Sequence, residues 1–273
     1  MAGRAYNACR PSGNSVTVWR EIREAGQRNR MSRALFQLNP SLDRDALADE
    51  FAREGRVQVR DLLTDDAAEE IFGVLSAGTP WGVAWQAGDK EKPQAIEAPE
   101  LKASPGEKQR EIAHKTYAAA AKAEYAFQFA RYPILDAYLA KWAEGGAHDL
   151  ILEHINAPEY LDFIRHVTGI PTIAKGDAQA TLFAPGHFLG RHIDSHVAEG
   201  WVVAYVMNFA KDWHPDWGGY LNFLDEEGDI VAGYRPRFNA LNMFKVPRAH
   251  MVSYVPPFAP IGRFAITGWF RDR

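Results

Sequence analysis

The sequence predicts a mostly β fold with helical support (α+β), in which a double-stranded β-helix, or jelly roll, follows a set of N-terminal helices. Two observations predict this fold. The hydrophobic pattern has helical spacing up to Gly169-Ile170-Pro171 and then changes to short β-rich runs. About eight such runs follow, separated by turn signals such as Pro185-Gly186 and Glu227-Gly228-Asp229. Many short strands with turns at this spacing are typical of a jelly roll.

The chain is expected to have three parts, of which the last two form one folded unit. Residues 1–40 begin polar and Arg-rich, which predicts a flexible N-terminal segment. Residues 41–170 are predicted to be a helical support region, and residues 171–273 the β-helix core. The predicted strands of the core are rich in β-branched and aromatic residues and cover 181–183, 188–192, 201–209, 219–224, 229–231, 240–246, 251–255 and 262–270.

The support region carries helix caps and helical spacing in most of its length. Its predicted helices cover 41–54, 64–75, 107–130, 135–142, 149–155 and 158–168, and its predicted strands cover 57–62 and 81–85. Residues 86–108 are rich in charge, Pro and Gly. A long irregular segment in a compact domain is either an active-site lid or a solvated loop, and both readings stay open.

Composition excludes several classes of function. The formal net charge is −4, so no basic field favours nucleic acid or an anionic membrane as a partner. Cys9 is the only cysteine, so no intrachain disulfide can form. No apolar run approaches the length of a membrane-spanning helix, and the N-terminus lacks the apolar stretch of a signal peptide. A cytoplasmic location is the default expectation, and the oligomeric state stays open.

The pair His192 and Asp194 is the first candidate for chemistry. The pair ends an extended-looking run, and residues two apart in a strand point to the same face. One imidazole and one carboxylate on one face can bind the same ion, and this donor set suits Fe(II), Mn(II) or Zn(II). His250, just before another apolar run, could supply a second imidazole. Two histidines and a carboxylate on one side of a metal leave open positions, as in non-haem Fe(II) oxygenases.

Arg263 is the fourth candidate residue. It lies in the apolar run 261–270, where alternation places Arg263, Ala265, Thr267 and Trp269 on one face. A buried guanidinium needs an anion, and its planar fork binds a carboxylate through two hydrogen bonds. We expect a diacid cosubstrate to supply that carboxylate.

These motifs together resemble the Fe(II)- and 2-oxoglutarate-dependent dioxygenases, and more narrowly their prolyl 4-hydroxylase-like branch. The resemblance is carried by His192-x-Asp194, His250, Arg263 and the closing Gly268-Trp269-Phe270. The segment 218–223, Gly-Gly-Tyr-Leu-Asn-Phe, resembles the Gly-Gly strand of that branch. The likeness covers 172–270. It implies that His192, Asp194 and His250 bind the metal and that Arg263 binds 2-oxoglutarate.

One position departs from the family pattern. Family members often carry a tyrosine about nine residues before the first metal histidine, and here that position is Phe183. Tyr205 matches a second tyrosine of the family and is predicted to contact 2-oxoglutarate instead. The alternative for Tyr205 is a purely structural role in the core.

The resemblance implies an oxygenase that hydroxylates a C–H bond with Fe(II), 2-oxoglutarate and O₂, with L-ascorbate as the reductant that rescues oxidised iron. The expected substrate is a prolyl residue of a peptide or protein, on family likeness alone. A free amino acid or another small metabolite is the alternative substrate. A non-catalytic, metal-binding jelly-roll module is the alternative from another class.

Two alternatives remain for individual site residues. His196 lies two residues beyond Asp194 and could compete as a metal ligand. Arg263 could instead form a structural ion pair with a carboxylate such as Asp225 or Asp229.

Overall fold

The protein is built around one large antiparallel sheet. The computed structural model describes residue 22 and residues 35–103, 105–194 and 199–273. The main path of the sheet runs, in spatial order, through β1 (Arg56–Arg60), β11 (Ala240–Lys245), β8 (Trp201–Asn208), β13 (Arg263–Arg271), β6 (Gln179–Phe183), β4 (Ala126–Tyr132), β7 (Phe188–Ile193), β12 (Ala249–Val252), β9 (Leu221–Leu224) and β10 (Ile230–Tyr234). Beside this path, β2 (Gly82–Ala87) pairs with β4 and with β3 (Gln94–Ile96), and β5 (Lys175–Gly176) pairs with β13.

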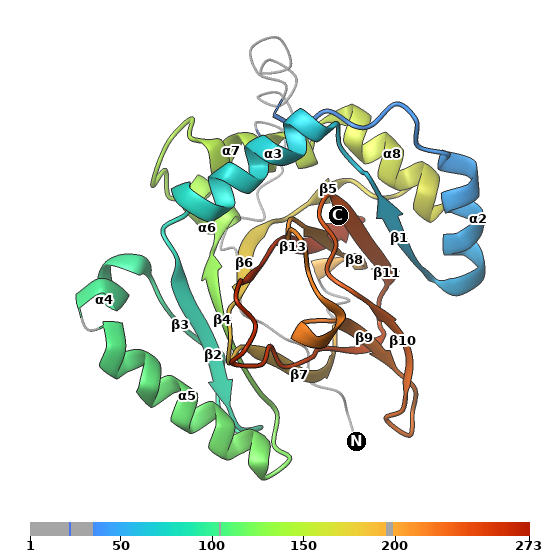
Figure 1. Cartoon of the computed structure of the whole chain (residues 1–273). Coiled ribbons are helices and arrows are strands. Elements are labelled where there is room, and N and C mark those ends of the chain that lie inside the picture. The colour runs from blue at the N-terminus through green and yellow to red at the C-terminus, as the bar shows by residue number, and fades with distance from the viewer. Residues whose placement is uncertain (1–21, 23–34, 104, 195–198) are drawn as a thin grey trace.

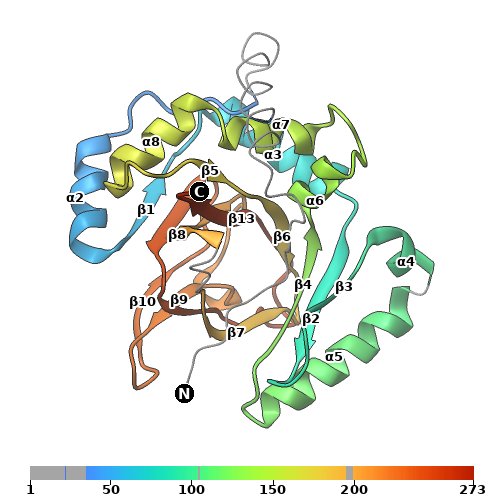
Figure 2. The same ribbon diagram turned by 180° about the vertical axis from the view of Figure 1, so that it is seen from behind.

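The sheet curls into a nearly closed barrel, which Figure 1 views from one side and Figure 2 from behind. This architecture is a double-stranded β-helix with helical support, so the predicted fold class is confirmed. Each of the eight strands predicted in the core region exists, with ends that differ by a few residues. The alternation of apolar and polar residues and the turn residues between the strands are local signals. In this region the tertiary contacts favour the same strands as these local signals.

Helices cover one side of the barrel (Figures 1 and 2). They are α2 (Arg44–Glu54), α3 (Asp65–Gly73) with the π-helical turn Val74–Gly78, α6 (Ile134–Leu139), α7 (Ala147–Ile155) and α8 (Pro158–Thr168). In α2, the Asp43 side chain accepts a hydrogen bond from the Ala46 amide at 3.0 Å, and Gly55 ends the helix at φ 64°. None of the helices in the described residues is long and apolar enough to cross a membrane.

Strand β8 separates two apolar clusters. Val203, Tyr205 and Met207 belong to the cluster between the sheet and the helices, whereas Ala204 and Val206 belong to the cluster inside the barrel. Alternate residues of a strand point to opposite faces, so the parity along β8 decides which of its side chains can reach the barrel interior.

Two predictions in the support region were wrong. Residues 86–108 are not irregular, because they contain β3, α4 (Ala98–Ala103) and the start of α5 (Pro105–Ala121). Ile96, Leu101 and Ile112 bury their side chains with residues of β2 in a small separate cluster. The predicted helix over 107–130 ends at Ala121, and 126–132 form β4, which is buried on both faces and pairs with β6 and β7. Whether residues 86–108 also move as a lid stays a prediction.

The predicted division at residue 40 was also wrong in part. Leu35, Phe36 and Leu38 are buried in the cluster beneath the helices, so the folded part of the chain includes residues that were expected to be flexible. Most of the predicted flexible segment, residues 1–21 and 23–34, lies outside the described residues. Strands β1 and β4, from the expected support region, join the same sheet as the core strands.

Candidate metal and cosubstrate site

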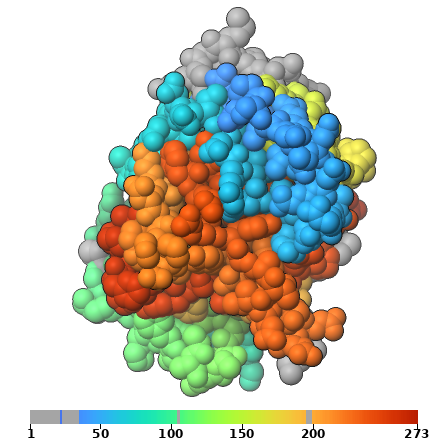
Figure 3. All heavy atoms as spheres, turned by 45° about the vertical axis from the view of Figure 1, so that its right-hand side comes forward, coloured from blue at the N-terminus to red at the C-terminus, as the bar shows by residue number. Residues whose placement is uncertain are grey.

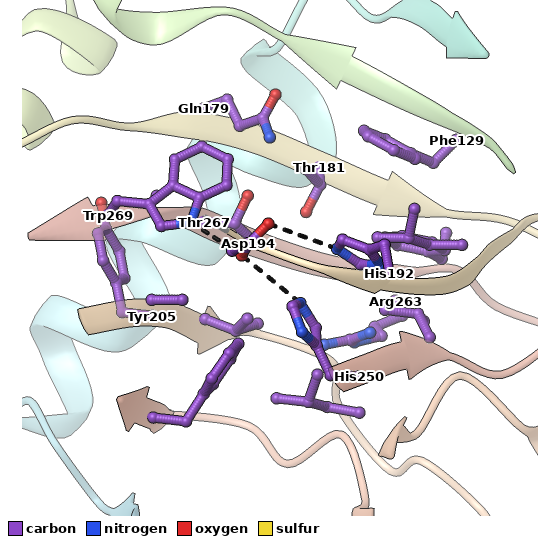
Figure 4. Close-up of a pocket in the computed structure, with 18 residues that line it drawn as sticks. Phe129, Gln179, Thr181, His192, Asp194, Tyr205, His250, Arg263, Thr267 and Trp269 are labelled. Carbon is purple, nitrogen blue, oxygen red and sulfur yellow. Dashed lines mark hydrogen bonds and ion pairs between the residues drawn. The ribbon is translucent and has the colours of Figure 1, made fainter. Parts of the chain in front are cut away.

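Strand pairing brings the two candidate histidines together. Strands β7 and β12 are antiparallel neighbours, and His250 is the direct partner of His192 in their register. Their ring centroids lie 4.1 Å apart. Asp194 follows β7 directly, and its carboxylate reaches back to both rings (Figure 4). Segments that are far apart in the sequence thus contribute to one cluster.

The three side chains form a compact, buried group. Asp194 Oδ1 lies 3.6 Å from His192 Nε2, and Asp194 Oδ2 lies 3.6 Å from His250 Nε2. One ligand atom from each residue lies within 4.8 Å of the others. The side chains of His192, Asp194 and His250 are 3%, 3% and 6% exposed. Two imidazole nitrogens and one carboxylate oxygen at this separation can hold one divalent ion of the first transition row.

Backbone carbonyls orient both imidazole rings. His192 Nδ1 lies 2.9 Å from the Gly190 carbonyl oxygen, and His250 Nδ1 lies 2.9 Å from that of Arg248. A donor at Nδ1 leaves the Nε2 lone pair free toward Asp194, which is the tautomer a metal ligand needs. Burial lowers the pKa of each histidine to about 4, and the neighbouring His250 adds to the shift at His192. Both rings are therefore neutral at pH 7.

A tryptophan and a second carboxylate hold Asp194 in place. The indole Nε1–H of Trp269 donates to Asp194 Oδ2 at 2.9 Å. The backbone amide of Trp269 in turn donates to Asp177 Oδ1 at 2.7 Å, and Arg271 pairs with Asp177 Oδ2. The indole also stacks on Trp201, with centroids 4.0 Å apart and planes 9° apart. Such outer contacts fix the direction of a ligand carboxylate.

Arg263 projects into the same pocket from the start of β13 (Figure 4). Its side chain is 2% exposed, and its Nε–H donates to the Asn208 side-chain oxygen at 3.1 Å. Its Nη1 has no hydrogen-bond partner among the described residues. The guanidinium carbon lies 5.4 Å from the centre of the Phe183 ring. Burial lowers the pKa of Arg263 to about 10, so the group stays cationic at neutral pH.

The alternative of an ion pair between Arg263 and Asp225 or Asp229 is not realised in the described chain. Asp225 instead accepts hydrogen bonds from the backbone amides of Gly228 and Asp229, both at 2.9 Å, and so closes a turn. A buried cation without an internal carboxylate is unfavourable unless an external anion binds it. The unpaired side of Arg263 is therefore a place for an anion.

Tyr205 occupies the other face of its strand. Its hydroxyl donates to the Asp177 carbonyl oxygen at 2.6 Å, and its ring stacks on Phe270 with centroids 4.7 Å apart. The side chain belongs to the cluster beneath the helices, and Tyr205 is also among the residues that line the pocket with Arg263. The contact of Tyr205 with 2-oxoglutarate stays a prediction. The alternative, a structural role in the core, fits the hydrogen bond and the stacking that Tyr205 makes.

The pocket that holds these groups has a cavity volume of about 70 Å³. Its lining is mostly apolar, with Gln179 and Thr181 among its polar members. The sequence analysis did not identify Asn208, the residue that accepts the hydrogen bond from Arg263. The signal was its position, because this polar residue alternates with Ala204 and Val206, which face the inside of the barrel. Tyr125 was missed too: its ring centroid lies 6.1 Å from that of His192, and its buried hydroxyl has no hydrogen-bond partner among the described residues. His196 falls in the segment 195–198, outside the described residues.

Comparisons with known proteins report likeness in sequence and in fold. Residues 178–271 match the family model described as 2OG-Fe(II) oxygenase superfamily. The comparison with curated proteins found no match. Among solved structures, the chain is similar to a Pseudomonas putida prolyl-4-hydroxylase, with 17% identity and a TM-score of 0.50 over 87% of this chain and 95% of that one. It is also similar to an oxidoreductase of the 2OG-Fe(II) oxygenase family from Burkholderia pseudomallei, with 13% identity and a TM-score of 0.52 over 87% and 94%. At these identities the two structures show a shared fold alone. The family model matches 94 of the 273 residues, and its description names the family that the motifs of this segment resemble.

Proposed function

We propose that the chain is an Fe(II)- and 2-oxoglutarate-dependent dioxygenase that hydroxylates a C–H bond. One observation carries the proposal: a buried group of two neutral imidazoles and a carboxylate shares its pocket with a buried arginine that has an unpaired face. His192, Asp194 and His250 are the proposed metal ligands, and Arg263 is the proposed partner of the far carboxylate of 2-oxoglutarate. When bound, Fe(II) with 2-oxoglutarate supplies the O₂-dependent oxidation of the substrate.

The residues themselves bind, orient and exclude water. His192 and His250 offer their Nε2 lone pairs because their Nδ1 atoms are engaged with carbonyls. Asp194 provides the anionic donor, which the Trp269 indole holds in a fixed direction. Arg263 offers Nη1 to a carboxylate while Asn208 fixes its Nε. The apolar lining keeps competing water away from these groups.

The finer part of the proposal concerns the substrate. We propose a prolyl residue of a peptide or protein, supported by motifs that resemble the prolyl 4-hydroxylase-like branch and by structural similarity to a prolyl-4-hydroxylase. A free amino acid or small metabolite is the alternative substrate. L-Ascorbate is proposed as the reductant on the same resemblance.

The deciding experiment measures succinate formation from 2-oxoglutarate with Fe(II), in the presence of peptides, free proline or cell extract. The variant Asp194→Ala removes the only anionic ligand, so we expect it to lose both stoichiometric iron and turnover. Wild-type iron content in Asp194→Ala would contradict the proposed triad. Iron binding without any 2-oxoglutarate turnover in the wild type, across all substrates, would favour a non-catalytic metal-binding module.

A further inference from the structure

Five arginines from three separate segments converge along the gap between the two ends of the sheet. Arg56 and Arg60 lie on β1, Arg235 and Arg237 lie in the connection from β10 to β11, and Arg248 lies in the turn before β12. We call these five residues the arginine strip. Strands β1 and β10 are the first and last strands of the main sheet path. Figure 3 looks onto this side of the molecule, where the blue to cyan β1 region lies beside the orange to red segment of β10 and β11.

One half of the strip surrounds a hollow in the surface. Arg60, Arg235 and Arg237 line this hollow together with Asp61 and Asp212. In the described part of the chain, none of the three arginines forms an ion pair. Burial lowers the pKa of Arg237, and the charges of Arg60 and Arg235 lower it further. The three cations therefore repel one another, and the fold supplies no paired carboxylate that would offset this.

The other half of the strip is separated from the metal site by two buried aromatic rings. The guanidinium carbons of Arg56 and Arg248 lie 5.6 and 5.9 Å from the centre of the buried Phe223 ring. The Phe223 ring packs on Phe244 at 5.2 Å between centroids, and Phe244 packs on His250 at 4.6 Å. Only two aromatic rings thus separate these arginines from a proposed metal ligand.

The two halves are continuous. Arg56 and Arg248 both lower the pKa of Tyr234, although burial raises it overall to about 12, and Tyr234 directly precedes Arg235. Arg56 pairs with Glu54 at 3.1 Å, and Arg248 makes no ion pair among the described residues. The strip follows β1 from Arg56 to Arg60, a rise of about 13 Å in an extended chain.

Five neighbouring arginines, of which only Arg56 forms an ion pair in the described residues, are unexpected in a chain with 31 basic and 35 acidic residues. Like charges held together destabilise a folded state unless a ligand of opposite charge compensates them. We propose that the arginine strip binds an extended, acidic segment of a polypeptide substrate and so presents an adjoining residue to the metal site. The link to a substrate rests on the proposed function; the binding of an acidic segment does not.

The layout of charges favours a peptide over a nucleic acid. Glu54, Asp61 and Asp212 lie among the arginines, so a strand with a negative charge at every nucleotide would meet repulsion along its path. A peptide can place carboxylates opposite the arginines and neutral residues opposite the acidic positions. A guanidinium also binds a carboxylate through two parallel hydrogen bonds, which favours Asp and Glu side chains as partners.

The test is a binding measurement that needs no turnover. Fluorescence anisotropy of the full chain is measured with a labelled peptide of about twelve residues that carries Glu at alternate positions around one proline. A matched peptide has Gln in place of Glu, and a single-stranded RNA of the same length is the third probe. The double variant Arg60→Glu/Arg235→Glu is compared with Arg60→Gln/Arg235→Gln. The control Lys102→Glu/Arg110→Glu makes the same charge change at exposed positions on α4 and α5.

We expect the Glu peptide to bind about tenfold more tightly than the Gln peptide at low salt, and this difference to shrink as salt is added. The Arg→Glu pair should weaken binding of the Glu peptide about tenfold, the Arg→Gln pair less, and the control pair less than about twofold. Equal affinity for the two peptides, or equal loss in the strip and control variants, would overturn the proposal. RNA that binds more tightly than the Glu peptide, and is lost in the strip variants, would overturn it too. If the chain shows no 2-oxoglutarate turnover, the binding result stands and only its assignment to a substrate fails.

Discussion

Replacement of Arg263 by methionine gives the sharpest test of the cosubstrate site. Methionine keeps much of the length of the side chain and removes the charge together with the unpaired Nη1. In a desolvated pocket, loss of a charge-assisted contact to a carboxylate costs about 2–5 kcal/mol. The dissociation constant of 2-oxoglutarate should therefore rise roughly thirty-fold or more. Arg263→Lys should recover only part of this loss, because an ammonium lacks the planar fork.

The same strand offers a matched control in Arg271, which is also 2% exposed. Arg271 pairs with the buried Asp177 carboxylate, whereas Arg263 has no carboxylate partner in the described chain. Arg271→Met should leave that carboxylate unpaired and lower the free energy of unfolding by about 3–5 kcal/mol. Arg263→Met leaves no charge unpaired, so its melting temperature should change far less.

The assay is calorimetric titration of 2-oxoglutarate into the anaerobic Fe(II)-loaded variants, next to thermal melting and a separate iron determination. We expect Arg263→Met to keep its iron and its melting temperature while it loses 2-oxoglutarate affinity. A folded Arg263→Met protein with wild-type affinity would refute the cosubstrate assignment. A large fall in melting temperature for Arg263→Met would show that the guanidinium acts mainly in folding.

Three further predictions concern single side chains. Trp269→Phe keeps an aromatic ring but removes the hydrogen bond to Asp194. Iron affinity, measured by metal titration, should therefore fall about 10–100-fold with little change in melting temperature. Unchanged iron affinity would exclude this positioning role. Tyr205→Phe removes the hydrogen bond to the Asp177 carbonyl and should lower the free energy of unfolding, measured by urea titration, by about 1 kcal/mol or more. Tyr125→Phe removes a hydroxyl that has no partner in the described residues and should not lower the free energy of unfolding. The reverse order of the two variants would contradict these contacts. Burial lowers the pKa of His148 from 6.5 to about 4, so the unfolded chain takes up the proton first, and the free energy of unfolding should fall as the pH drops from about 6.5 toward 4. His148→Gln should make this fall smaller. A pH profile of the melting temperature that is the same in His148→Gln and in the wild type would contradict this prediction.

The sequence predicted the β-helix well because its signals there are local. Turn residues bound each strand, and the strands themselves alternate or run apolar over a few residues. The pair His192-x-Asp194 is also local, since both ligands follow from one strand and its end. The distant candidates His250 and Arg263 were named from their residue types and the apolar runs beside them. No local pattern connects them with the pair, and only the pairing of strands brings them to it.

The misses have a common physical cause. The Ala-rich run up to Ala121 predicts helix, and residues 126–130 were read as its continuation. They form a strand because β2 pairs along one edge of this segment, and β6 and β7 pair along the other. Tyr205 and Asn208 lie on opposite faces of β8, and alternation alone does not say which face is inside. That assignment depends on which neighbouring elements cover the strand, and sequence periodicity does not contain this information.

The direct pairing of His192 with His250 has a consequence for how this site tolerates change in the chain. Between the two histidines lie several connections between strands, and insertions in those connections leave the pairing of β7 and β12 intact. A single residue inserted within either strand, in contrast, would turn one imidazole to the opposite face of the sheet. Proteins that share this site can therefore differ widely in the number of residues between the histidines, while the parity within each of the two strands stays fixed.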